Sequence, residues 1–362
     1  MARRGGIVVV RVQGMMMPER VLSYPQAICE ATDQAMAADP SVLLFGLGVD
    51  DAKAILGTTK DLVTKHGAAR VFDTPLSEDA MTGVAIGLAL AGMRPIHVHI
   101  RMDFLMLAMN QLVNMAAKTH YMYGGQENVP LVVRAIIGKS WGQGAQHSQA
   151  LHSFFMHVPG IKVVAPSTPY DAKGCLNAAI RDNNPVLFVE HRILYFLKSD
   201  VPTETYYVAP GKARRVTEGS DVTLVGVSQM QLECFRAQIY LKEMGISAEV
   251  IDPIWLSPLD MDTIIESVRK TKRLCVVDNG WLTCGASAEI VARVCETLQG
   301  EKIQVKRMGF ANTPCPPTPP LEDLFYPNAR TIASAVHKMV KGVEKLPDER
   351  NELKSAEFKG PF

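Results

Sequence analysis

Two acids, Glu78 and Asp79, stand together at the head of an apolar segment, and no further charge follows them before Arg94. Ser77 precedes them and is a good helix N-cap, so both acids fall in the first turn of a predicted helix. Unpaired backbone N–H groups and the helix dipole favour negative charge there, and capping alone explains both acids. The alternative is a carboxylate that binds a ligand or moves a proton, because partial burial raises the pKa of a carboxyl group.

Residues 138–153, "GKSWGQGAQHSQALHS", combine glycines with side chains that do chemistry. They follow an apolar run, and ligands of parallel α/β sheets bind beyond the carboxyl ends of strands. Glycines let a backbone approach a ligand, and the imidazole of His147 suits proton transfer near neutral pH. The alternative is a surface loop with an exposed histidine. The Gly-Lys-Ser is no phosphate loop, because Val133 stands where that motif needs its first glycine.

The elements that must position these residues alternate along the chain. Residues 41–48 and 129–137 are short apolar runs that predict strands, whereas 24–39 and 104–122 have helical periodicity. Such alternation predicts an α/β fold with a largely parallel sheet that is covered on both faces. Polarity then rises, and the alternation restarts. We expect a first domain at 20–198, a linker at 199–218, a smaller α/β domain at 219–345 and a charged tail at 346–362.

Two of the predicted helices have unusual compositions. The helix after Glu78 is apolar on every side and rich in glycine and alanine, so we expect it to be buried with its neighbours close by. The helix 104–122 is rich in methionine. Methionine suits a subunit contact, although a soft core helix accounts for that segment equally well.

Composition excludes several classes of protein. The net charge of +1 provides no electrostatic footprint for nucleic acid or an anionic membrane surface. No apolar run approaches the roughly 20 residues that span a bilayer. The 7 cysteines are scattered and include no C-x-x-C pair, which indicates free thiols in a reducing compartment. We expect a cytoplasmic protein, with an organellar leader as the lesser alternative.

Several stretches, in their order and spacing, resemble the beta subunits of the thiamine-diphosphate-dependent 2-oxo acid dehydrogenases of the pyruvate and branched-chain type. They are "RVFDTPLSEDAMTGVAIGLALAGMRPI", "AAKTHYMYGGQENVPLVVR", "GAQHSQ", "VPGIKVVAPSTPYDAKGCLNAAIRDNNPVLFVEH", "VTLVGVSQM" and "VVDNGWLTCGASAEIVARV". The resemblance implies a transketolase-like architecture. A thiamine-diphosphate-binding α/β domain with a parallel sheet, the pyrimidine-binding domain, would precede a smaller transketolase C-terminal-like α/β domain.

The resemblance also implies roles for three side chains. Glu78 matches the glutamate that hydrogen-bonds the aminopyrimidine of thiamine diphosphate, which lets that ring draw the proton from the thiazolium C2, while Asp79 stays with the cap. Phe104 matches an aromatic residue that stacks on the pyrimidine, although its position suits a core residue equally well. His147 matches a histidine near the thiazolium and the substrate.

Two ions and one partner follow from the same resemblance. Relatives bind K⁺ largely through backbone carbonyls, at positions that match Leu131, Ala179, Ile180, Asp182 and Asn184. Mg²⁺ is bound with the diphosphate by a Gly-Asp-Gly…Asn motif, and no Gly-Asp-Gly occurs in this chain. The resemblance therefore implies a separate alpha subunit that carries this motif, in an α2β2 heterotetramer.

Two departures from the family pattern fall where substrate is expected. In place of a typical E-F-M-T-F-N-F run, the chain has "VHIRMDF", which contributes His99, Arg101 and Asp103; "IGKSWGQGA" adds Lys139 and Trp141. Positive charge there suits a substrate with a second carboxylate or a phosphate, or an altered acyl acceptor. Ordinary drift with solvated side chains is the alternative.

The resemblance implies a subunit that decarboxylates a 2-oxo acid and passes the acyl group to the lipoyl domain of an acyltransferase partner. A split transketolase-like or acyloin-forming enzyme is the first alternative; it would share Glu78 and His147 but use an aldehyde acceptor. A non-catalytic assembly subunit that keeps the fold without binding cofactor is the second.

Overall fold

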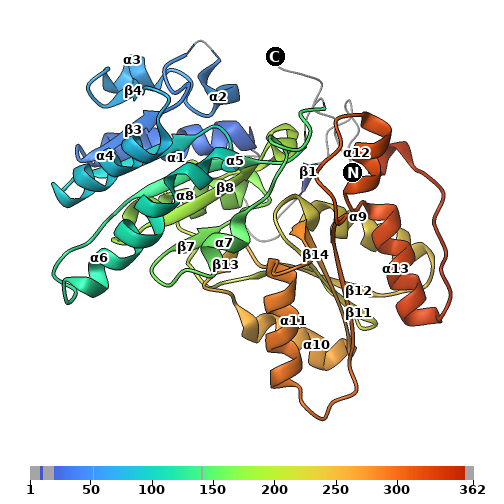
Figure 1. Ribbon diagram of the computed structural model, residues 1–362. Helices are drawn as coiled ribbons and strands as arrows, with labels where there is room; N and C mark the ends of the chain where they lie inside the picture. The colour runs from blue at the N-terminus through green and yellow to red at the C-terminus, as the bar shows by residue number, and fades with distance from the viewer. Residues whose placement is uncertain (1–8, 11–19, 52, 140–141, 355–362) are drawn as a thin grey trace. The chain divides into compact units, whose positions relative to one another are not determined.

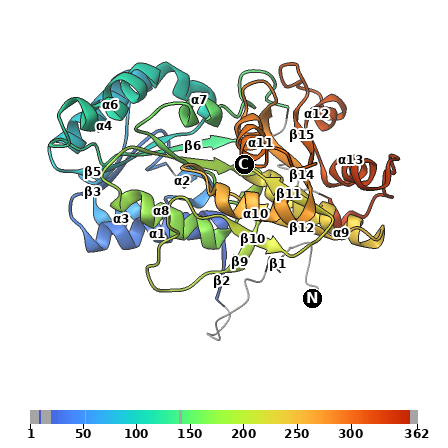
Figure 2. The same cartoon turned by 90° about the horizontal axis from the view of Figure 1, so that it is seen from below.

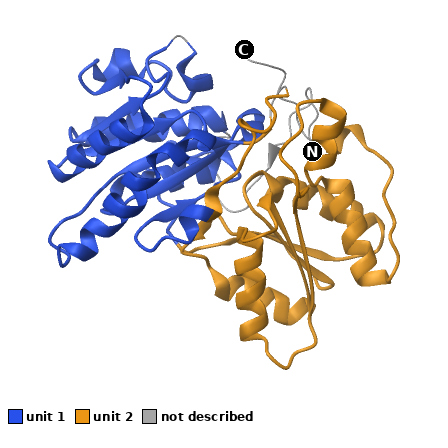
Figure 3. Cartoon of the chain, viewed as in Figure 1, with its two compact units in different colours: residues 1–137, 154–210 blue, residues 138–153, 211–362 orange. Residues whose placement is uncertain are grey.

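The computed structural model describes residues 9–10, 20–51, 53–139 and 142–354 (Figure 1). The chain divides into two compact units (Figure 3). The first contains Met1–Ile137 and Phe154–Pro210, and the second contains Gly138–Ser153 and Gly211–Phe362. Residues 138–153, which we call the His147 segment, therefore pack with the second unit although they lie in sequence within the predicted first domain.

The main sheet of the first unit is built from short strands that are mostly apolar, with a few buried polar residues among them. Its order is β7-β8-β6-β5-β3-β4, and every neighbouring pair is parallel. Continuous apolar runs form these strands because both faces of the sheet are covered. The strands of the main sheet are β3 (Val42–Gly46), β4 (Val71–Asp73), β5 (Arg94–His99), β6 (Val132–Ile137), β7 (Lys162–Val164) and β8 (Val186–His191).

Helices cover this sheet on its two faces (Figure 2). Helices α1 and α8 pack together on one face, and α4 packs with η1 and η2 on the other. Local signals begin α1 and α8: Ser23 and Thr168 are their N-caps, and each has a proline in its first turn. The helices are α1 (Tyr24–Ala38), α2 (Ala54–Gly57), α3 (Leu62–His66), α4 (Glu78–Leu90), α5 (Met102–Leu105), η1 (Met106–Ala108), η2 (Asn110–Ala116), α6 (Ala117–Met122), α8 (Pro169–Arg181) and η3 (Arg192–Phe196); α7 (His152–Met156) crosses the division between the units.

Helix α4 begins at Glu78, as the sequence predicts, but its environment differs from the expectation. Ser77 occupies the N-cap position without a side-chain capping hydrogen bond. Only one side of the helix is buried, whereas Val84 and Leu90 are each 47% exposed. The prediction of a fully buried helix is therefore wrong for the chain by itself. An apolar composition indicates that a helix surface is buried in the native assembly. It does not indicate whether the same chain or a partner chain covers that surface.

The predicted helix 104–122 is helical throughout but not uniformly α-helical. The 3-10 turn of η1 follows α5, and a π-helical stretch, η2, precedes α6. Such irregular turns change which side chains share a face. Leu107 and Met115 in these turns are 61% and 50% exposed, on the side of the sheet that α4 also covers.

The second unit repeats the α/β plan on a smaller scale. Its sheet has the order β10-β12-β11-β14-β15, parallel except for the edge strand β10. Helices α9 and α13 pack around one apolar core, and α10 and α11 around another. The elements are β10 (Arg214–Thr217), β11 (Val222–Gly226), β12 (Ala248–Asp252), β13 (Trp255–Ser257), β14 (Arg273–Trp281), β15 (Gln304–Phe310), α9 (Gln229–Glu243), α10 (Met261–Thr271), α11 (Ala286–Thr297), α12 (Pro319–Phe325), α13 (Ala329–Lys341) and η4 (Asn351–Leu353).

The predicted linker 199–218 is less irregular than its polarity indicates. Its start lies in β9 (Lys198–Asp200), which pairs with β1 (Val9–Val10) and β2 (Val21–Ser23) in a small sheet of the first unit. Its end lies in β10, which extends the sheet of the second unit.

Among the described residues, none of the helices is both long enough and apolar enough to cross a membrane.

Candidate active site

The carboxyl edge of the first unit's sheet presents several of the predicted site residues. Glu78 begins α4 shortly after β4 ends, and Arg101 and Phe104 follow the end of β5. Strands β4, β3 and β5 are parallel neighbours, so these residues leave the sheet at the same edge. That edge is where ligands of open α/β sheets bind.

The start of α4 is fixed against the neighbouring strands. Asp73, the last residue of β4, accepts backbone hydrogen bonds from residues 48–50 in the loop after β3. One turn after Glu78, Thr82 Oγ1 lies 3.4 Å from His99 Nε2 at the end of β5. Gly83, in the next position, faces the side chain of Gln111 in η2, where a Cβ would make an ordinary contact at 3.6 Å. The helix head that carries Glu78 is thus held on both sides.

Glu78 and Phe104 both keep surface for a ligand. Glu78 is half-buried at the first position of α4, and the adjacent Asp79 is exposed. Phe104 is 37% exposed in α5. Glu78 thus lies at the positive end of the α4 dipole, and Phe104 keeps part of its surface accessible.

Beside this edge lies a buried histidine pair on β5. His97 stacks on Phe45 at 4.7 Å between ring centroids and meets His99 edge-on at 4.4 Å. Burial lowers the pKa of His97 to about 4, and burial together with His97 lowers the pKa of His99 well below its ordinary value. His99 is therefore neutral at physiological pH. It adds an imidazole near the edge, but not the positive charge that the sequence suggested there.

Arg101 supplies the positive charge at this edge. The residue is half-buried, and desolvation lowers its pKa while the neighbouring Asp103 opposes that shift. A guanidinium stays protonated under such a change. Asp103 is 7% exposed, so Arg101 presents its charge beside a buried acid.

The remaining predicted residues of the site belong to the second unit. The backbone N–H of His147 donates to Gly144 O at 3.5 Å, and His147 is half-buried. Lys139 Nζ lies 2.9 Å from Asp323 Oδ1 in α12 and 5.6 Å from the ring centroid of Tyr326, so its ammonium already has partners. Trp141 lies outside the described residues.

One buried contact of the His147 segment was missed by the sequence reasoning. His152 Nε2 lies 3.0 Å from Asp278 Oδ1, with the two side chains 2% and 0% exposed. The only sequence signal was a second histidine five residues after His147, and no spacing rule pairs it with an acid in β14.

The positions predicted for potassium lie at the opposite edge of the first sheet. Leu131 precedes β6, and 179–184 lead from α8 into β8, so these residues stand at the amino ends of parallel strands. Arg94 Nη1 donates to the carbonyls of Ile180 at 3.0 Å and Asp182 at 3.1 Å. Lys162 Nζ bonds the Asp182 carboxylate at 2.8 Å. The carbonyl and carboxylate oxygens of this loop therefore bind the side chains of Arg94 and Lys162.

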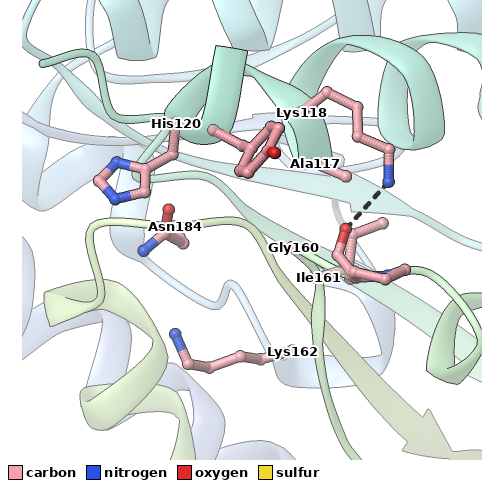
Figure 4. Close-up of a pocket in the computed structure, with 9 residues that line it drawn as sticks. Ala117, Lys118, His120, Gly160, Ile161, Lys162 and Asn184 are labelled. Carbon is pink, nitrogen blue, oxygen red and sulfur yellow. Dashed lines mark hydrogen bonds between the residues drawn. The ribbon is translucent and has the colours of Figure 1, made fainter. Parts of the chain in front are cut away.

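A pocket of about 590 Å³ lies near the same edge (Figure 4). Its walls come from α6 and from the chain entering β7, and its lining includes Lys118, His120, Lys162 and Asn184. Neither Glu78 nor Phe104 lines it. Within the described part of the chain, no group of three or more His, Cys, Asp or Glu side chains could hold a metal ion.

Each half of the chain matches the model of a known protein family. The pyrimidine-binding domain of transketolase matches residues 20–198, and the transketolase C-terminal domain matches residues 211–332.

Curated relatives match nearly the whole chain. The acetoin:2,6-dichlorophenolindophenol oxidoreductase subunit beta of Cupriavidus necator is 46% identical over 334 residues, which cover 89% of this chain and 98% of the relative. The pyruvate dehydrogenase E1 component subunit beta of Porphyra purpurea is 41% identical over 315 residues, covering 87% and 95%. The mitochondrial E1 subunit beta-1 of Arabidopsis thaliana is 39% identical over 338 residues, covering 92% and 93%.

Solved structures share the fold at lower identity. A split-gene transketolase, described as an inactive beta4 tetramer, superposes with a TM-score of 0.71 at 22% identity, covering 90% of this chain and 99% of that one. A transketolase mutant of Pichia stipitis gives a TM-score of 0.63 at 15% identity, covering 93% of this chain and 48% of the transketolase. The predicted fold class, with a pyrimidine-binding domain ahead of a transketolase C-terminal-like domain, is confirmed.

Proposed function

Since this chain belongs to the family of the beta subunits of thiamine-diphosphate-dependent 2-oxo acid dehydrogenases, within the transketolase-like superfamily, we propose that it and an alpha subunit decarboxylate a 2-oxo acid and pass the acyl group to a lipoyl acceptor. The observation that carries the proposal is the near full-length identity with E1 beta subunits, together with Glu78 at the head of α4 on the carboxyl edge of the sheet. When bound, thiamine diphosphate supplies the nucleophilic carbon and the electron sink for cleaving the bond beside the carbonyl.

The chain's own residues would orient the cofactor and handle protons. Glu78 would hold a proton shared with the aminopyrimidine nitrogen, from the first turn of a helix that contacts the end of β5 through Thr82 and His99. Phe104 would stack on the same ring. His147 would donate or accept a proton at the substrate oxygen. Arg101 would attract the carboxylate of an anionic substrate.

The alpha subunit would complete the site and would carry the carboxylate and amide ligands for Mg²⁺ and the diphosphate. The exposed apolar residues on α4, η1 and η2 support such a partner, because large side chains such as Val84, Leu90, Leu107 and Met115 are uncovered in the chain by itself. We expect an α2β2 assembly. Free thiols at every described cysteine support a reducing compartment such as the cytoplasm.

A potassium ion at the loop after α8 belongs to the same proposal. The carbonyls of Ile180 and Asp182 converge on Arg94 Nη1, and each oxygen has a second lone pair that K⁺ could use. The carbonyls of Leu131, Ala179 and Asn184 would complete the set. We expect KCl to raise the melting temperature above that in NaCl at equal ionic strength. Equal melting temperatures would remove potassium from the proposal.

The decisive experiment is co-expression of this chain with its alpha subunit, followed by assay of CO₂ release and of dye reduction. We expect both activities to need both chains. Glu78→Gln should lower kcat on the order of 10²–10⁴-fold, as loss of a general acid–base group does, in a complex that still assembles. Asp79→Asn, which changes the adjacent acid in the same helical turn, is the matched control and should retain activity.

A second candidate function is the oxidation of acetoin, which the 46% identity with the Cupriavidus necator acetoin oxidoreductase subunit favours. The same cofactor chemistry would then release an aldehyde where a 2-oxo acid releases CO₂. Offering acetoin and pyruvate separately distinguishes them: aldehyde with dye reduction from acetoin alone would assign the second function. Failure of the assembled complex to bind thiamine diphosphate would exclude both and leave a non-catalytic assembly subunit.

A further inference from the structure

The His147 segment is held in the second unit by a buried pair of side chains, His152 and Asp278. We propose that this pair positions His147 for its step in the reaction, so that His152 is a positioning residue of the enzyme. The proposal rests on the function proposed above for His147. It adds His152 as a residue that acts through His147 and does not itself contact the substrate.

The pair is a strong contact by its geometry and burial. His152 Nε2 and Asp278 Oδ1 are 3.0 Å apart, with side chains 2% and 0% exposed. A carboxylate only accepts hydrogen bonds, so Nε2 carries the proton and donates it. His152 Nδ1 is buried and has no hydrogen-bond partner among the described residues. The bond to Asp278 is thus the polar contact through which this imidazole is oriented.

Asp278 is itself fixed by rigid elements. It lies within β14, an interior strand of the second unit's sheet, and its Oδ2 accepts a hydrogen bond from the backbone N–H of Ser287 at 3.3 Å. Ser287 is in the first turn of α11, so the carboxylate lies at the positive end of that helix. A Cβ at Gly285 would lie 3.3 Å from Asp278 Oδ2 and 2.3 Å from a backbone oxygen, so glycine there leaves room for the carboxylate.

Two further contacts hold the upstream part of the segment. Lys139 pairs with Asp323, whose side chain is 70% exposed, and such a pair is screened by solvent. Gly142 fits against Pro317 O, which a Cβ would approach to 2.3 Å. Neither contact lies between His147 and the downstream end of the segment. His152, five residues after His147, holds that end through its bond to Asp278.

Loss of this contact should displace His147 without removing it. A displacement of about 1 Å in a reacting group can lower a rate about 10²-fold. We therefore expect His152→Leu to lower kcat of the α–β complex by about 10–10²-fold and to leave thiamine diphosphate affinity unchanged, because Glu78 and Phe104 belong to the first unit. His152→Gln, whose amide nitrogen can take the place of Nε2, should recover most of the rate.

Two controls separate positioning from general stability. His337→Leu removes another buried histidine of the second unit, one bonded to Val343 O at 2.7 Å, and should lower stability without lowering kcat. In a His147→Ala background, His152→Leu should have little further effect, since both changes act on one group. Additive losses, or no recovery in His152→Gln, would overturn the proposal.

Hydrogen exchange in the isolated chain tests the same contact without any activity. We expect amides of residues 142–153 to exchange faster in His152→Leu, and those of the first unit's sheet to be unchanged. Unchanged exchange in 142–153 would overturn the proposal. A wild-type complex that is inactive on every substrate would instead refute the proposed function, and the exchange result would stand by itself.

Discussion

Arg134 and Glu190 form a two-pronged ion pair between adjacent strands β6 and β8, with both side chains wholly buried. Arg134 Nε lies 2.6 Å from Glu190 Oε1, and Nη2 lies 3.0 Å from Oε2. Tyr195 adds its hydroxyl to the same carboxylate at 2.6 Å. A charge pair in the middle of a parallel sheet is tolerated because the two charges are bonded to each other and the carboxylate accepts a further hydrogen bond from Tyr195.

Breaking this pair should destabilise the first unit strongly. Arg134→Met leaves a buried carboxylate with Tyr195 as its remaining partner, and we expect a loss of about 3–5 kcal/mol in the free energy of unfolding. Urea unfolding followed by circular dichroism measures it. Lys338→Met, which breaks an exposed pair with Glu344, should change stability by less than about 1 kcal/mol. Equal effects of the two substitutions would contradict the burial argument.

Stability should fall in mild acid because of the histidine pair. Unfolded His97 takes up a proton below its ordinary pKa of 6.5, whereas the folded residue does so only near pH 4. Between these two pH values the unfolded state binds more protons than the folded state. The contribution of His97 to the free energy of unfolding, about 3 kcal/mol, is therefore fully present above pH 6.5 and is lost progressively as the pH falls to 4. The lowered pKa of His99 acts in the same direction.

The measurement is urea unfolding of the isolated chain at pH 5 and at pH 7.5. The double variant His97→Leu with His99→Phe removes both titrating groups and should lose less stability between the two pH values than the wild type does. The same loss in both proteins would show that other groups cause the acid sensitivity.

Gly160 permits a close approach between the chain entering β7 and helix α6 (Figure 4). Its φ is +101°, and a Cβ would lie 2.0 Å from Ala117 O. Gly160→Ala should therefore lower the melting temperature and cost about 2 kcal/mol or more, through both strain and overlap. Gly92→Ala is the matched control: φ is +90°, but nothing lies within 4 Å of the new Cβ, so only strain of about 1 kcal/mol should appear. A Gly160→Ala protein no less stable than the control would refute the close contact.

The uncovered apolar side chains should matter for assembly and not for folding. Leu107→Lys places a charge at a residue that is 61% exposed in η1, so the isolated chain should keep its melting temperature. Association with the alpha subunit should weaken at least tenfold in a pull-down titration. Leu346→Lys, a charge placed at a 55% exposed leucine of the second unit, serves as the comparison and should bind normally. Equal binding by both variants would place the interface elsewhere.

The sequence predicted the local elements well where a short-range signal specified them. The start of α4 at Glu78 followed from a polar head before an apolar run, and the continuous apolar runs became parallel strands. The helix 104–122 was found, but its 3-10 and π-helical turns, which pack against α4, were not, because hydrophobic periodicity does not distinguish these helix types over a few residues. The His152–Asp278 pair joins residues far apart in sequence, which periodicity does not connect.

By itself, the sequence determined the order of strands and helices, the two α/β halves and the family, since hydrophobic period and motif spacing are properties of the chain. Only the tertiary structure decided which groups lose water. It made His99 neutral by burial on β5, left one face of α4 exposed, and packed the His147 segment with the second unit. Burial depends on what surrounds a side chain in space, and that surrounding comes from distant parts of the chain.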